Sequence, residues 1–105
     1  MMIAINENKE QSCQQLLAAF FKKYPNPGLQ VEVDRTLNLL LESQTPMPGK
    51  SGGWAGGIVY ATAYCYKSAC GIPGLLNSEC EEFFNVSMST IYKRAWMIRK
   101  LILDM

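Results

Sequence analysis

Apolar residues recur with helical spacing in three parts of the chain, residues 9–24, 30–43 and 88–103. Positions three and four apart share one face of an α-helix, so each segment predicts a helix with one buried side. The apolar positions are Cys13, Leu16, Leu17, Phe20, Phe21 and Tyr24 in the first segment, Val33, Leu37, Leu40 and Leu41 in the second, and Ile91, Ala95, Ile98 and Ile102 in the third, which Trp96, Leu101 and Leu103 widen.

The segment Gly49–Tyr66, GKSGGWAGGIVYATAYCY, differs because it is apolar on nearly every side of a helix. A helix of this kind is buried, and the other helices need such a partner. Ser51 is a candidate N-cap. Gly56 and Gly57 are expected where a neighbouring backbone leaves no room for a Cβ, since glycine otherwise costs a helix roughly 1 kcal/mol. The alternative is a hydrophobic strand bounded by glycines.

Residues 75–84 predict a short helix that starts near Asn77 or Ser78, with Glu79 and two further glutamates close behind. Acidic side chains favour a helix N-terminus. Asn85 follows and takes a left-handed turn conformation at low cost. Ser87 is the expected N-cap of the last helix. The stretches 25–28, 45–49 and 70–74 are rich in proline and glycine and predict rigid connectors.

Composition fits one small domain: the chain has 105 residues, 49% hydrophobic and 18% charged. We expect a flexible N-terminus over residues 1–8 and a single all-α domain over 9–105. The net charge of +1 is too small to attract nucleic acid or a membrane through the overall electrostatic field of the protein. The N-terminus lacks the pattern of a secretory signal, so the expected location is cytoplasmic. The apolar run is also shorter than the roughly 20 residues that span a bilayer.

Candidate catalytic chemistry is sparse. The chain has no histidine, and its cysteines, Cys13, Cys65, Cys70 and Cys80, form no CxxC pair. We therefore expect no metal and buried free thiols. Paired carboxylates and phosphate-binding glycine motifs are absent too, so we expect no enzyme activity, no cofactor and no small-molecule substrate.

The segment SECEEFFNVSMSTIYKRA resembles a helix-turn-helix, in which an acidic first helix ends at a turn and "V-S-x-x-T-I" starts the recognition helix. The resemblance implies that the recognition helix enters the DNA major groove and that its N-terminal residues contact the base edges. Two positions differ from that pattern. Four residues before the turn the pattern usually has a small side chain, and this chain has Glu81. At the turn the pattern usually has glycine, and this chain has Asn85. Carried over, the DNA-facing candidates are Ser87, Met88, Ser89, Thr90, Tyr92, Lys93 and Arg94.

The longer stretch is similar to one cyclin-like repeat of the transcription factor IIB family. Gly49-Lys50-Ser51 matches the start of that family's central helix, and Tyr60-Ala61 matches its embedded tyrosine. The chain also resembles small uncharacterised prokaryotic domains with WAAAIVY followed by FFGVSxST. The resemblance implies a five-helix bundle around a buried central helix, with a helix-turn-helix at 75–103.

Two functions follow from this resemblance. The first is a DNA-binding or transcription-associated regulatory module, since the last helix carries four basic residues and no acidic one before Asp104. The alternative is a protein-interaction or homodimerisation module of the same fold without DNA binding, with a groove of large apolar side chains. The basic residues can equally be a solvated helix face. Candidate groove residues are Met47, Phe84, Met88, Trp96 and Met97. The alternative is that they belong to the core, and this alternative is favoured for Phe84 and Trp96.

Overall fold

The computed structural model describes residues 7–66 and 75–103, with side chains over 9–63 and 75–103. Within these residues there are five α-helices and no strand, so the all-α prediction is confirmed. The helices are α1 (Glu7–Lys23), α2 (Pro27–Glu42), α3 (Ser51–Tyr66), α4 (Asn77–Phe84) and α5 (Met88–Ile98), followed by a π-helical end, η1 (Arg99–Leu103). None of the described helices has the length and apolar character needed to span a bilayer.

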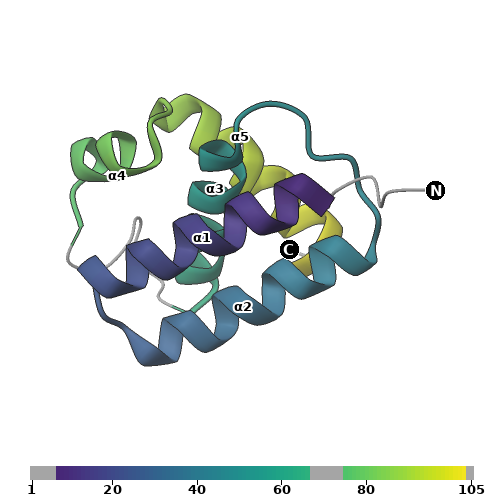
Figure 1. The fold of residues 1–105 in the computed structure, drawn as a ribbon, viewed down its shortest axis with the longest axis horizontal. Coiled ribbons are helices and arrows are strands. Elements are labelled where there is room, and N and C mark those ends of the chain that lie inside the picture. Colours follow the sequence, from purple (N-terminus) through teal and green to yellow (C-terminus); the bar gives the residue numbers. More distant parts are fainter. Residues whose placement is uncertain (1–6, 67–74, 104–105) are drawn as a thin grey trace.

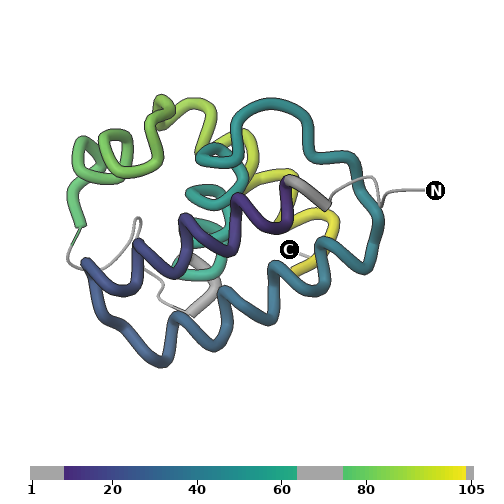
Figure 2. The backbone as a smooth tube through the Cα atoms, in the orientation of Figure 1, coloured from purple at the N-terminus to yellow at the C-terminus, as the bar shows by residue number. Residues whose placement is uncertain are grey.

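Helices α1 and α2 form an antiparallel pair, with α3 and α5 behind them and α4 at one end (Figure 1). The tube in Figure 2 shows the chain turning back sharply between α1 and α2, and passing through a long connector from α2 to α3. Helix α3 packs against each of the other four α-helices, and most extensively against α5. The position of α5 is therefore set chiefly by α3.

Two helix boundaries differ from the prediction at the N-terminal end of the chain. Helix α1 begins at Glu7, two residues earlier than predicted; residues 1–6 lie outside the described part. Helix α2 begins at Pro27, three residues earlier than predicted. Asn26 caps it, since its side-chain oxygen accepts a hydrogen bond from the Leu29 N–H at 3.2 Å. Proline suits the first helical position because it needs no N–H donor there.

The start of α3 also differs by one residue. Ser51 is the first helical residue rather than the cap, and the Lys50 carbonyl accepts a hydrogen bond from the Gly53 N–H at 3.1 Å. The connector before it is held by α1, because Lys9 Nζ donates to the Gly49 carbonyl. Gly49 has a φ of 87°, which favours glycine. The predicted connector at residues 70–74 lies outside the described residues.

The glycines of α3 mark its contact with α4 and α5. A Cβ on Gly57 would lie 2.7 Å from the Arg94 Cβ and 3.1 Å from the Ala95 backbone nitrogen, which confirms the predicted close crossing. A Cβ on Gly56 would instead meet side chains, at 3.1 Å from both Ile91 and Phe84. The tightest position is Gly52, where an added Cβ would lie 1.9 Å from the Phe84 carbonyl oxygen.

Aromatic rings join α1 to α4. The rings of Phe20 and Phe84 stack with centroids 5.3 Å apart, and Phe83 meets Phe20 edge-on at 5.5 Å. Phe84 is buried, as predicted. Trp96 is 58% exposed, so the prediction that it belongs to the core is wrong. The aromatic cluster fixes α4 at the end of the bundle, from which the turn leads into α5.

Candidate nucleic-acid interface

The turn between α4 and α5 has the geometry that the sequence predicts. Asn85 is left-handed, with φ 56° and ψ 41°, and ends α4. Ser87 caps α5: its hydroxyl accepts a hydrogen bond from the Thr90 N–H at 3.3 Å. The Ser87 hydroxyl also lies 3.0 Å from that of Ser89. The cap therefore consumes much of the hydrogen-bonding capacity of Ser87.

Glu81 has a role that the sequence comparison does not reveal. Its Oε2 accepts a hydrogen bond from the Met88 N–H at 2.7 Å, across the turn. A carboxylate at this place accepts a hydrogen bond from a backbone N–H that has no partner within the helix. Its negative charge also interacts favourably with the positive end of the helix dipole. The Glu81 side chain thus forms a polar link between α4 and the start of α5. Because Glu81 occupies the N-terminus of α5, that end is a poor site for phosphate.

The predicted DNA-facing residues separate into two groups. Met88 is buried and cannot reach a ligand, and Thr90 is partly buried beside Gly53. The exposed group is Ser87, Ser89, Tyr92 and Lys93. The prediction therefore fails for Met88, because its side chain fills the core beneath the turn.

Arg94 turns inward and joins α5 to the connector before α3. Its guanidinium carbon lies 4.6 Å from the centroid of the buried Trp54 ring, and Nη2 donates to the Pro48 carbonyl at 3.0 Å. Trp54 Nε1 donates to the same carbonyl at 2.8 Å. Arg94 is thus a structural residue, and Lys93 is the outward-facing basic residue of the pair.

The exposed side of α5 carries aromatic and basic side chains together. An open pocket of about 610 Å³ lies along it. The Tyr92 ring meets the Tyr60 ring edge-on at 5.2 Å, and its hydroxyl accepts a hydrogen bond from Asn77 Nδ2 at 3.0 Å. Lys100 Nζ lies 5.9 Å from the Trp96 ring centroid. We call this surface the α5 face; it consists of the pocket-lining residues Tyr60, Ser89, Tyr92, Lys93, Trp96 and Arg99, together with Lys100 beside Trp96.

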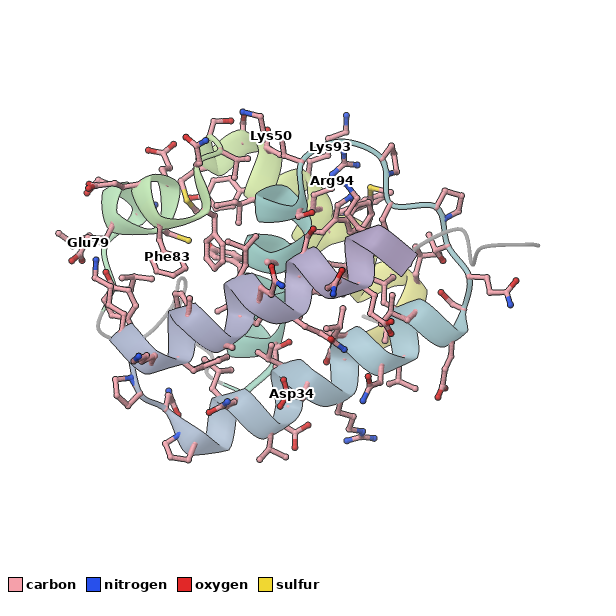
Figure 3. The ribbon with its side chains drawn as sticks, viewed as in Figure 1. Asp34, Lys50, Glu79, Phe83, Lys93 and Arg94 are labelled. Carbon is pink, nitrogen blue, oxygen red and sulfur yellow. The ribbon has the colours of Figure 1, made fainter. Side chains whose placement is uncertain are left out.

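Sequence reasoning did not assign Tyr60, Trp96 and Lys100 to the DNA-facing set. The spacing of Tyr92, Trp96 and Lys100 at four-residue intervals was a usable signal, because such residues share one side of a helix. Figure 3 shows Lys93 and Lys50 at the same edge of the molecule, with Asp34 on the other side of the view. The charge along α5 and η1 is purely basic, since residues 88–103 contain no Asp or Glu.

The described residues contain no group of three or more His, Cys, Asp or Glu side chains that would hold a metal ion. No family model, no curated protein and no solved structure matches the chain. The α5 face is therefore assessed on its own chemistry.

Two buried thiols give a prediction about alkaline stability. Burial raises the pKa of Cys13 and of Cys80 from 9.0 to about 11; Lys9 opposes the shift at Cys13, and Glu81 adds to it at Cys80. Above pH 9 the unfolded chain loses these protons while the folded chain keeps them until about pH 11. The free energy of unfolding should therefore fall as the pH rises through this window.

The measurement is urea unfolding at pH 8 and at pH 10, for the wild type and for Cys13→Ala with Cys80→Ala. The double variant should be less stable at pH 8 but should lose less stability between the two pH values. An equal loss in both proteins would contradict the assignment of this pH dependence to the two thiols.

Proposed function

We propose that this chain is a DNA-binding, transcription-associated module that uses α4, the Asn85 turn and α5 as a helix-turn-helix. The observation that carries the proposal is the basic surface of α5 and η1, on which Lys93 and Lys100 are exposed. Lysine side chains on one face provide phosphate contacts and make affinity depend on salt. We also infer that the five helices correspond to one cyclin-like repeat, with α3 as its central helix. The contacts of α3 with the other four α-helices support that inference.

Binding of a fluorescently labelled 20-base-pair duplex, followed by anisotropy at 50 to 200 mM salt, tests the proposal. Lys93→Ala with Lys100→Ala should weaken binding and reduce the slope of log affinity against log salt by about 2, since each lost phosphate contact lowers it by about 1. Lys22→Ala with Arg35→Ala is the matched control, because it removes two exposed charges from α1 and α2. Absence of binding at 50 mM salt, or equal effects of the two double variants, overturns the proposal.

A second candidate function is self-association through the same helix. Exposed apolar side chains on α5 and η1 favour it: Tyr92 is 43%, Trp96 58% and Leu101 54% exposed. Such a patch is typical of an interaction surface. Sedimentation velocity over a wide range of protein concentration tests this function. A dimer that Trp96→Ala dissociates would support it, and a monomer at every concentration would exclude it.

A further inference from the structure

The aromatic rings of the α5 face suit unpaired bases better than they suit a paired duplex. Inside a duplex the flat faces of the bases are covered by their neighbours, so a helix in the major groove meets only base edges and phosphates. Side chains that read those edges best are Arg, Asn and Gln. The exposed positions within α5 (Met88–Ile98) carry none of these: they are Ser89, Tyr92, Lys93 and Trp96. Arg99, at the start of η1, also lines the pocket but is only partly exposed. Arg94 is held by Trp54 and Pro48.

The same rings are well suited to unpaired bases, whose flat faces are free. Base–aromatic stacking tolerates any sequence because every base has a π-face. Trp96 is the most exposed ring of the α5 face. Tyr92 is held in place by two neighbours, the Tyr60 ring and the Asn77 amide. A ring that is already fixed loses little conformational entropy when a base stacks on it.

Charge on the α5 face is complementary to a nucleic-acid backbone. Lys93 lies one position after Tyr92, and Lys100 lies beside Trp96. Lys93 also lines the same pocket as Tyr92, so this face carries ammonium groups that can neutralise the phosphates of stacked nucleotides. Single-stranded binding surfaces combine a basic track and aromatic platforms in this way.

We propose that the α5 face binds single-stranded DNA, with unpaired bases stacked on Trp96 and Tyr92 and phosphates at Lys93 and Lys100. This inference rests on the proposed DNA-binding function and specifies the form of DNA that the surface prefers. The open pocket beside Tyr60 provides the space into which a base on Tyr92 would extend.

The experiment compares a labelled 20-nucleotide single strand with the duplex of the same sequence, using the full chain at 50 mM salt. The single strand should bind about tenfold more tightly. Trp96→Ala should reduce its affinity by about tenfold, the effect of losing one stacked base, whereas Trp96→Phe should retain most of it. Val31→Ala, on the exposed side of α2, is the control and should bind as the wild type does.

Tryptophan emission gives a second readout. Trp54 is completely buried, so stacking should quench only Trp96. Quenching by the single strand should occur in the wild type and should be absent in Trp96→Phe. Duplex affinity equal to or above that of the single strand overturns this inference and leaves the proposed function standing. Unchanged single-strand affinity in Trp96→Ala also overturns it. Binding of the single strand without binding of the duplex overturns the helix-turn-helix function alone, and absence of binding to both DNAs overturns both proposals.

Discussion

Gly52→Ala is expected to lower the free energy of unfolding by about 3 kcal/mol, the upper part of the range for overpacked positions. The added Cβ would lie 1.9 Å from the Phe84 carbonyl oxygen and 3.0 Å from the carbonyl carbon. Both are backbone atoms at the end of α4, so no side-chain rotation can relieve the clash. Either α3 must move, or α4 and the turn must. Urea unfolding followed by circular dichroism measures the loss.

The matched control is Gly28→Ala in α2. Gly28 is exposed, and nothing lies within 4 Å of the place that its Cβ would take. Because alanine has the better helix propensity, this variant should gain a few tenths of a kcal/mol to about 1 kcal/mol. If Gly52→Ala is as stable as the wild type, the close approach of α3 to the end of α4 is wrong.

Trp54→Ala should cost about 3–5 kcal/mol, the usual loss for truncating a buried aromatic side chain. Trp54 is 0% exposed, donates a hydrogen bond to the Pro48 carbonyl and carries the Arg94 guanidinium on its ring. The variant therefore removes core contacts and also frees the connector between α2 and α3. Thermal and urea unfolding should both report the loss.

Two further variants separate the contribution of the indole hydrogen bond from that of the buried ring, and the buried tryptophan from the exposed one. Trp54→Phe keeps a ring but loses the indole donor, so it should cost less than Trp54→Ala. The same substitution at the exposed tryptophan, Trp96→Ala, should change stability by only about 0.5 kcal/mol. Equal losses at the two positions would contradict the assignment of Trp54 to the core and Trp96 to the surface.

Helical periodicity predicted much of the fold because it depends on local spacing alone. It placed Leu17, Leu37 and Ile98 on buried faces, and the glycines of α3 predicted a close crossing at Gly57. It could not place Trp96, because spacing shows which residues share a face but not whether another helix covers that face. The exposure of Trp96 depends on where the other helices pass.

The candidate site was harder to predict than the fold. Lys93 and Arg94 are adjacent and chemically similar, and only the approach of the connector at Pro48 decides that Arg94 turns inward. Glu81 departs from the helix-turn-helix pattern, and its partner, the Met88 N–H, lies seven residues further along the chain. Both contacts are tertiary, so no local rule predicts them.

The inward position of Arg94 affects how a charge-scanning screen of this protein must be interpreted. Arg94→Ala would remove the guanidinium from the Trp54 ring and from the Pro48 carbonyl, and α5 would lose an attachment to the connector. Under the proposed function, such a variant would lose DNA affinity through the lost attachment of α5 rather than through a lost phosphate contact. Arg94→Lys would also lose part of this attachment, since an ammonium group lacks the planar guanidinium that stacks on the Trp54 ring and donates to the Pro48 carbonyl. If Lys93 contacts phosphate as proposed, a screen scored on binding alone would therefore give Arg94 the same rank as Lys93, although Arg94 acts through the position of α5.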